Sequence, residues 1–260
     1  MEKVSDKESY NNSMSKSVLD KMFFLDKVPD NIVIVDWGCA DGALLKEVMK
    51  FFPENDYLGY DIDENMIKKA RDNAGDAFLT SEFQYLKSEL FINSYPSKKV
   101  VVNLSSVIHE VYSYRNTEEI DEFWEDVFQL ADIVVIRDMI FRQSMDRNAC
   151  PNDVRKIRSN ADKRYLQDFE SIEGSINNNK NLIHYLMKYR YKDNWEREVR
   201  ENYFPLSRER LDRIIPSNFK IRYESMFALP YTQRRVEEDF GVEIKDDTHL
   251  KLILEKEGDN

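Results

Sequence analysis

A glycine-bearing turn flanked by carboxylates is the first feature of the sequence that could do chemistry. It runs from Asp36 to Gly42 and follows a short apolar run at 32–35. Gly38 allows a tight turn and a close approach of a ligand, while Gly42 lets the next helix pack near the strand. The G-x-G-x-x-G pattern that cradles a pyrophosphate is absent, and Asp36 and Asp41 make the turn hostile to an anion. The turn therefore predicts a ligand that carries positive charge.

A second acidic position follows the next apolar run. Asp61 ends the run at 57–60, roughly 20 residues after the glycine turn, where an acidic side chain can take both hydroxyls of a ribose. Asp63 is a neighbouring candidate, and strand alternation points Ile62 away from the two acids, where it can lie against an adenine face. These residues predict a nucleoside ligand without a pyrophosphate.

The elements that must position these residues alternate along the chain. Strands are expected at 32–35, 57–60, 83–86, 99–104, 133–136, 219–224 and 249–254, and helices at 13–25, 44–52, 65–73 and 117–130, the last with Thr117 as its cap. Five strands separated by helices are typical of an α/β fold with a doubly wound parallel sheet, because parallel neighbours need crossover connections. The two late strands predict a mostly parallel seven-stranded sheet with an antiparallel edge pair.

Together these motifs resemble the first two motifs of class I S-adenosylmethionine-dependent methyltransferases. The resemblance rests on residues 35–42, Val-Asp-Trp-Gly-Cys-Ala-Asp-Gly, and on 58–63 followed by Met66. It implies a seven-stranded Rossmann-like fold and S-adenosylmethionine as the cofactor, with its methionine part at the glycine turn and its ribose at Asp61. The expected cofactor-binding residues are Asp36, Gly38, Cys39, Ala40, Gly42, Asp61, Ile62, Met66, Glu89 and Ser105.

Two of those assignments come from later motifs of the same family. Glu89 is the nearest match to an acidic residue that follows the third strand and meets the adenine amino group, with Ser88 as an alternative. Ser105 lies in 103–110, Asn-Leu-Ser-Ser-Val-Ile-His-Glu, which is similar to the motif that lines the methyl-transfer site in many members.

The expected catalytic residues are His109, Asp138 and Glu110. His109 follows the fourth strand and has an ordinary pKa near neutrality, so it suits a general base, and Glu110 can orient it or the acceptor. Asp138 ends the fifth strand on the ligand-binding edge. The alternatives are that His109 only packs in the structure and that Asp138 braces the site in a buried pair with Arg137. Cys150 lacks the companion Pro-Cys of a nucleophile that acts on pyrimidines.

Residues 139–213 form the other distinctive part of the sequence. We expect a helical insertion, or cap, on the substrate side, while 1–138 and 214–260 form the cofactor-binding domain. The insertion carries 16 Lys and Arg against 12 Asp and Glu, hence about +4, and its aromatic residues alternate with basic ones around 184–195. That composition suits phosphate contacts and base stacking. The alternative is an amphipathic cap whose aromatic residues form a small core and whose charges pair at i, i+4, for example Glu196 with Arg200.

Composition limits the remaining classes. The net charge of -11 argues against a surface that coats nucleic acid, and two cysteines build neither a disulfide framework nor a CxxC metal site. No metal is expected, and no apolar run spans a membrane, which favours a cytoplasmic protein. The sequence predicts a methyltransferase acting at oxygen or nitrogen of a small or medium-sized acceptor. The alternatives are a nucleic-acid methyltransferase and an inactive regulatory protein that binds the cofactor.

Overall fold

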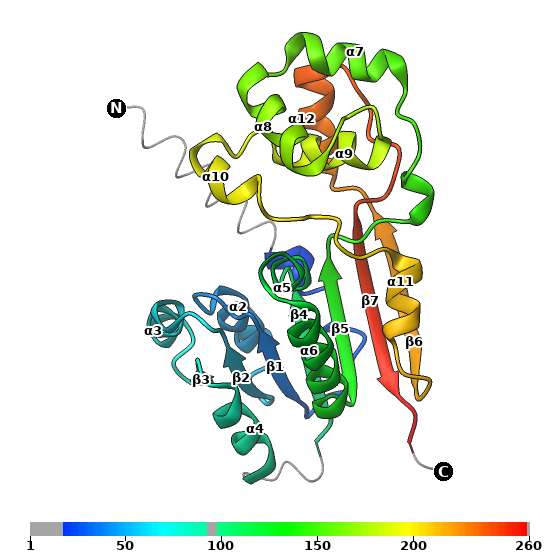
Figure 1. Ribbon diagram of the computed structural model, residues 1–260. Helices are drawn as coiled ribbons and strands as arrows, with labels where there is room; N and C mark the ends of the chain where they lie inside the picture. Colours follow the sequence, from blue (N-terminus) through cyan, green and yellow to red (C-terminus); the bar gives the residue numbers. More distant parts are fainter. Residues whose placement is uncertain (1–17, 93–97, 259–260) are drawn as a thin grey trace.

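Seven strands form one sheet in the computed structural model, which describes residues 18–92 and 98–258 (Figure 1). The strands are β1 (Val33–Trp37), β2 (Asp56–Tyr60), β3 (Phe78–Thr80), β4 (Val100–Ser105), β5 (Ile133–Asp138), β6 (Phe219–Phe227) and β7 (His249–Lys256). Their order is β3-β2-β1-β4-β5-β7-β6, with β7 antiparallel to both neighbours and the other pairs parallel. The predicted sheet, including its antiparallel edge pair, is confirmed.

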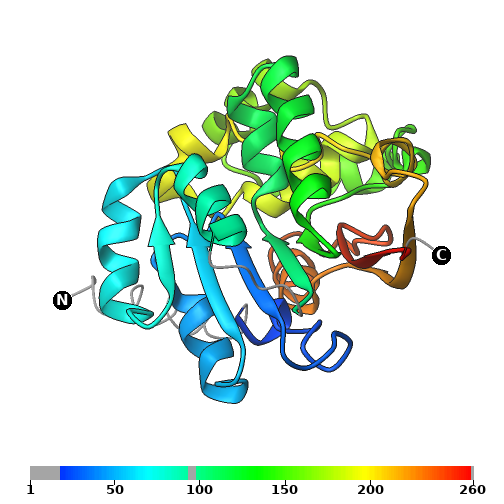
Figure 2. The same cartoon turned by 90° about the horizontal axis from the view of Figure 1, so that it is seen from below.

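Helices cover both faces of this sheet (Figure 2). They include α2 (Ala43–Phe51), α3 (Glu64–Asn73), α4 (Phe83–Ile92), α5 (Ile108–Tyr114), α6 (Thr117–Leu130) and α11 (Arg208–Ile214). Every residue of β1 and β5 is buried, as expected for strands rich in β-branched residues between two helical layers. One apolar core joins the sheet to α4, α6 and α11, and a second joins it to α2 and α3.

The third strand lies earlier than the sequence indicates. The strand predicted at 83–86 is wrong, because β3 spans only Phe78–Thr80 and α4 begins at Phe83. The apolar residues Phe83, Leu86 and Leu90 recur at i, i+3 and i+7 and all pack on the core, which is helical spacing. A strand of three residues leaves too short a pattern to be recognised, and the apolar residues at the start of the following helix resemble a strand in the sequence.

Two helix ends also differ from expectation. Helix α6 spans the predicted residues, but its N-cap is Asn116, whose side chain and that of Glu119 form a reciprocal capping box, and Thr117 is the first helical residue. In the predicted leading helix, residues 13–17 lie outside the described part of the chain. Residues 18–21 are helical and 22–27 form turns, so the helix ends before Leu25.

A helical cap stands beyond the carboxyl ends of the parallel strands (Figure 1). It contains α7 (Pro151–Asn160), α8 (Lys163–Glu173), α9 (Asn179–Lys188), α10 (Trp195–Glu198) and α12 (Pro230–Phe240), together with the short 3-10 helices η1 (Gln143–Met145) and η2 (Lys192–Asn194). These helices enclose their own apolar core, which takes Val236 and Phe240 from α12. By contrast, Leu211 of α11 packs into the core of the sheet. The domain division at residues 138 and 213 stays a prediction. Within the two described ranges, no helix is long and apolar enough to cross a membrane.

Candidate active site

The loops that follow β1, β2, β4 and β5 meet at one edge of the sheet, on the side of the cap (Figure 1). The backbone is unusual at two of these loops. Gly38, Ala40 and Gly42 after β1, and Ser106 after β4, all have positive φ angles. Non-glycine residues rarely adopt this conformation, and such strain concentrates at functional sites. Two of the three non-glycine residues with positive φ in the described ranges, Ala40 and Ser106, thus lie at the edge chosen from the sequence.

The glycine turn is tightly enclosed, and its N–H groups are already used. A Cβ atom on Gly38 would lie 2.8 Å from Val107 Cγ2, and one on Gly42 would lie 3.1 Å from Ala70 Cβ. The N–H groups of Gly38 and Cys39 both donate to the carbonyl of Tyr60, at 2.7 and 3.0 Å. A pyrophosphate needs several free N–H groups. The turn therefore does not offer the cradle that a dinucleotide requires.

Asp61 ties the glycine turn to the end of β2. Its Oδ2 accepts from the N–H of Ala40 and its Oδ1 from the N–H of Asp63, both at 2.9 Å. An ionised carboxylate has about four lone-pair sites, so both oxygens can still accept from ribose hydroxyls. Asp63 has a different task, because its side chain caps α3 through Asn65 N. Beside these acids Ile62 is 64% exposed, which leaves an apolar surface for a flat ring.

Asp36 is a buried carboxylate at the end of β1. Asn103 Nδ2 donates to it at 2.7 Å, and Ser105 Oγ donates in turn to Asn103 Oδ1 at 3.1 Å. Burial raises the pKa of Asp36 to about 6, against the opposing effects of the Asn103 hydrogen bond and the charge of Lys21. The structure thus brings Asp36 and Ser105 together at the predicted edge, joined through Asn103.

Three other residues expected to bind the cofactor, Cys39, Ala40 and Met66, differ in how exposed they are. Cys39 is buried, and its Sγ lies 3.0 Å from where a Cβ on Gly59 would be, so its side chain packs in the core and only its backbone is at the turn. Ala40 is exposed and Met66 is partly buried.

Glu89 lies away from this edge. It belongs to α4 and lines a cavity of about 600 Å³ together with Asp56 and Phe78, the first residues of β2 and β3. That cavity is at the amino ends of the strands. With β3 ending at Thr80, the acidic residue that follows the strand is Glu82, which is exposed and whose N–H is held by Thr80 Oγ1 at 3.0 Å. The misplaced strand explains why the sequence led to Glu89.

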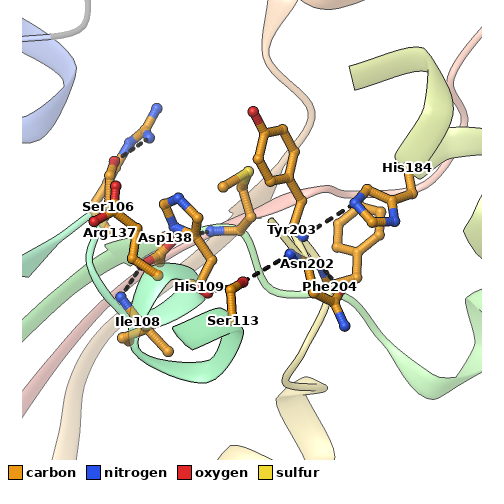
Figure 3. Close-up of polar contacts among 12 residues, drawn as sticks. Ser106, Ile108, His109, Ser113, Arg137, Asp138, His184, Asn202, Tyr203 and Phe204 are labelled. Carbon is orange, nitrogen blue, oxygen red and sulfur yellow. Dashed lines mark hydrogen bonds and ion pairs between the residues drawn. The ribbon is translucent and has the colours of Figure 1, made fainter. Parts of the chain in front are cut away.

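His109 and Asp138 form a buried pair at the ends of β4 and β5 (Figure 3). His109 Nδ1 lies 2.8 Å from Asp138 Oδ1, and the carboxylate also accepts from the N–H groups of Ile108 and Met139, both at 2.7 Å. Although burial opposes ionisation, the charge of His109 and these hydrogen bonds keep the pKa of Asp138 lowered, so it is ionised and accepts from Nδ1–H. In the described part of the chain, Nε2 of His109 forms no hydrogen bond.

The pair also sets the protonation of the imidazole. Burial on its own lowers the pKa of His109, but the charge and hydrogen bond of Asp138 outweigh it, so the pKa is raised above its ordinary value. Weaker contributions in the same direction come from Glu110 and Glu201. An imidazole oriented by a carboxylate on one nitrogen can accept a proton on the other.

Arg137 does not pair with Asp138, so the braced pair considered above is absent. Neighbouring residues of a strand point to opposite faces, and Arg137 instead donates to Asp20 Oδ2 at 2.9 Å through Nε. Lys251 of β7 binds the other oxygen of Asp20. These contacts fix the leading helical turn against the edge of the sheet.

The same helical turn carries Lys21, a residue that the sequence did not single out. Desolvation lowers the pKa of Lys21, against the nearby charges of Asp36, Asp138 and Glu110, which act to raise it. Its approach depends on the anchoring of Asp20 to β5 and β7, segments more than 100 residues away. No local motif signals such a contact.

Glu110 turns to the cap and not to His109. Its Oε1 lies 3.0 Å from Arg197 Nη2, and Arg197 Nε binds Glu201 at 2.6 Å. The i, i+4 pair in this part of the cap is therefore Arg197–Glu201, and Glu196–Arg200 is not among the ion pairs of the described residues. Glu110 is thus placed to join α5 to the cap.

Several basic and aromatic side chains of the cap stretch at 184–195 make contacts within the protein. Lys188 is fully buried and donates to the carbonyl of Glu201. Arg190 and the hydroxyl of Tyr189 both bind Asp239 of α12. Trp195 is buried in the core of the cap. Side chains in such positions are not available to stack on nucleic-acid bases.

Comparisons with known proteins find a family model for part of the sequence and solved structures with a similar fold. Residues 29–135 match a family model described as a methyltransferase domain. A solved S-adenosylmethionine-dependent methyltransferase from Anabaena variabilis aligns over 92% of this chain and 83% of its own, with 12% identity and a TM-score of 0.52. The plantazolicin methyltransferase BamL, solved with a desmethyl analog and SAH, aligns over 98% of this chain and 88% of its own, with 12% identity and a TM-score of 0.48. No curated protein matched by sequence.

The matched domain contains β1 to β4, the glycine turn and the first half of β5. Together with the seven-stranded sheet, this match confirms the predicted family, enzyme class and cofactor. Residues 29–135 thus form a methyltransferase domain with the class I fold, and S-adenosylmethionine is its cofactor.

Proposed function

We propose that the chain transfers a methyl group from S-adenosylmethionine to an oxygen or nitrogen of a small or medium-sized acceptor, with His109 as the general base. The observation that carries this proposal is the buried His109–Asp138 pair at the cofactor edge, beneath the cap (Figure 3). An acceptor hydroxyl or ammonium must lose a proton as it gains the methyl group. His109 Nε2 is the group placed to receive it.

The residues at the edge fit the cofactor. Its ribose hydroxyls match the acceptor oxygens of Asp61, and an adenine ring matches the exposed surface of Ile62. Glu82, directly after β3, takes the place proposed for the contact with the adenine amino group. The positive charge of the cofactor suits Asp36, whose carboxylate has no ion pair among the described residues beyond its hydrogen bond from Asn103. When bound, the cofactor supplies an electrophilic methyl group on a sulfonium.

The residues of the proposed site then have separate roles in the reaction. Asp36, Asp61 and the glycine turn bind the donor. Asp138 holds the His109 ring in one tautomer, with Nδ1–H toward itself and a lone pair on Nε2. His109 takes the proton that the acceptor loses. The cap closes this side of the sheet, which limits water and selects the acceptor.

The test is to label small-molecule, RNA, DNA and protein fractions of a lysate with methyl-tritiated cofactor. The proposal expects label in the small-molecule fraction, and expects His109→Gln to reduce its rate about 10²-fold or more without changing cofactor affinity. Label in RNA or DNA would instead support the nucleic-acid alternative. Cofactor binding without label in any fraction would support the regulatory alternative. A cytoplasmic location stays a prediction.

A further inference from the structure

Residues 197–204, which we call the bracket, connect α10 of the cap to the helix that carries His109. Three of its contacts reach α5. Arg197 Nη2 lies 3.0 Å from Glu110 Oε1, and Tyr114 OH donates to Glu201 Oε1 at 3.2 Å. The N–H of Asn202 donates to Ser113 Oγ at 2.8 Å.

The third contact leads directly to His109. Ser113 Oγ, which accepts from Asn202, donates at 2.6 Å to the backbone carbonyl of His109. One hydroxyl thus joins the bracket to the backbone of the expected base (Figure 3). Movement of the bracket would be transmitted through this short link.

The opposite side of the bracket is held by the cap. The N–H of Tyr203 donates to His184 Nε2 at 3.1 Å, and Lys188 donates to the carbonyl of Glu201. Burial and the charge of Lys188 lower the pKa of His184 well below its ordinary value, so its ring is neutral and Nε2 accepts. The bracket is therefore held on the cap side by buried His184 and Lys188, and on the α5 side by exposed or partly exposed side chains.

Tyr203 lies between the two histidines (Figure 3). Its ring meets the His109 ring edge to face, with centroids 5.6 Å apart at 81°. Its hydroxyl binds Glu198, and Lys188 Nζ lies 4.6 Å from its ring centroid. With only 8% of its surface exposed, the ring is fixed from three directions.

We propose that Tyr203 is a positioning residue, which holds the His109 ring on Asp138 and shields this pair from bulk water. The proposal deepens the proposed function and rests on it, because a positioned imidazole matters only where His109 acts as the base. The sequence does not reveal this role, since 94 residues separate the two rings and only the folded cap brings them together.

The charged groups around His109 come from several elements. Asp138 lies on β5, Glu110 on α5 and Glu201 in the bracket, and buried His249 at the start of β7 is close enough to feel its charge. Burial lowers the pKa of the imidazole and the three carboxylates all raise it, so a changed pKa in a variant would not separate shielding from charge. A sharper observable is therefore the exchange of the His109 Nδ1 proton with water, which reports shielding directly.

The experiment compares Tyr203→Leu, Tyr203→Phe and the wild type. We expect exchange of the His109 Nδ1 proton, followed by NMR, to become at least about tenfold faster in Tyr203→Leu, while Tyr203→Phe keeps the ring and the slow exchange. The turnover of Tyr203→Leu should fall roughly 10–100-fold, as misplacement of a reacting group by about an ångström does, with cofactor affinity unchanged. His109→Gln identifies the resonance.

Tyr189→Leu is the matched control, because Tyr189 also places its hydroxyl on a carboxylate of the cap, Asp239. Slow exchange in a folded Tyr203→Leu variant would overturn the proposal, as would an equal loss in Tyr189→Leu. If Tyr203→Leu does not fold, Ser113→Ala cuts the link to His109 and should speed exchange; unchanged exchange there also overturns it. If His109→Gln keeps full activity, the proposed function fails, whereas the exchange result still tests the contact.

Discussion

The two sides of the candidate site are assembled differently. On the cofactor side, the glycine turn joins Asp61 through a hydrogen bond from the N–H of Ala40 to the Asp61 carboxylate, across 21 positions. On the acceptor side, His109 depends on Asp138, on Ser113 and on Tyr203 of the bracket. In the proposed site, binding of the donor thus relies on two neighbouring loops, whereas the placement of the base also relies on β5 and the bracket, two segments distant in the sequence. Changes on the first side should alter affinity, and changes on the second should alter turnover.

The largest effect is expected on the acceptor side, for Asp138→Asn. Both oxygens of Asp138 accept hydrogen bonds, from His109 and Met139 at Oδ1 and from Ile108 at Oδ2. An amide has only one oxygen, so at least one of these partners loses its acceptor. We expect turnover to fall about 10²–10⁴-fold while cofactor affinity, measured by calorimetry, stays within about threefold.

Asp132→Asn is the matched control for this prediction. Asp132 precedes the opposite end of β5, and its side chain accepts from the N–H of Val100 at 2.8 Å. It should leave turnover nearly unchanged. Equal losses in the two variants would mean that turnover falls when either carboxylate is lost, and would contradict the proposed contrast between the two sides of the site.

The next effect belongs to the cofactor side. Asp61→Ala removes the acceptors for the ribose, and hydrogen bonds to a charged group contribute about 1.5–3 kcal/mol each. We therefore expect cofactor affinity to fall roughly 10–100-fold and turnover at saturating cofactor to change little. Asp63→Ala serves as the control, because Asp63 caps α3 and its loss should cost about 1 kcal/mol of stability with little change in affinity. Loss of turnover alone in Asp61→Ala would contradict the assignment.

A smaller, pH-dependent effect is expected at Asp36. Its pKa of about 6 means that it is ionised above this pH and neutral below it. A cationic ligand prefers the ionised form, so cofactor affinity should decrease as the pH falls below 6, by up to about tenfold per pH unit. In Asp36→Asn this dependence should disappear. A wild-type affinity that stays flat from pH 7 to pH 5 would remove Asp36 from the site.

The substitution Asp36→Asn should also make the fold more stable at neutral pH. Because the pKa is raised on folding, the folded chain holds this proton more tightly than the unfolded chain, and above pH 6 the ionised group destabilises the fold. Asp36→Asn should therefore increase the free energy of unfolding at pH 7 by roughly 1–3 kcal/mol. Denaturant titration at pH 7 and pH 4 checks the sign, since the gain should largely vanish at the lower pH.

The cofactor side was largely predictable because its signals are local. A buried strand, a glycine turn and an acid at the next strand end are all visible within 30 residues, and the structure brings Asp36, Gly38 and Asp61 together. The exception is Glu89, where a strand of three residues gave no recognisable pattern. The assignments of individual residues to the cofactor stay predictions until they are tested by mutation.

The acceptor side was only partly predictable. His109 follows β4 and Asp138 ends β5, and the rule that ligands bind at strand ends was enough to single them out. Tyr203, Lys21 and the partner of Glu110 depend on how the cap and the leading turn pack, and helical spacing within one segment does not determine that. Helix α12 illustrates the limit, because it follows β6 in the sequence yet completes the core of the cap.

The smallest effect is expected at the exposed basic residues of the cap. Lys192 and Arg200 are exposed, whereas the other basic and aromatic residues of this stretch are mostly paired or buried. If the acceptor is a small molecule, replacing both by Ala should leave turnover within about twofold, and any affinity for RNA should be weak in wild type and variant alike. Arg190→Ala breaks a partly exposed ion pair with Asp239 and should cost less than about 1 kcal/mol. A large, salt-dependent loss of activity in the double variant would instead show that the cap contacts phosphates, since each lost phosphate contact reduces the salt slope by about one.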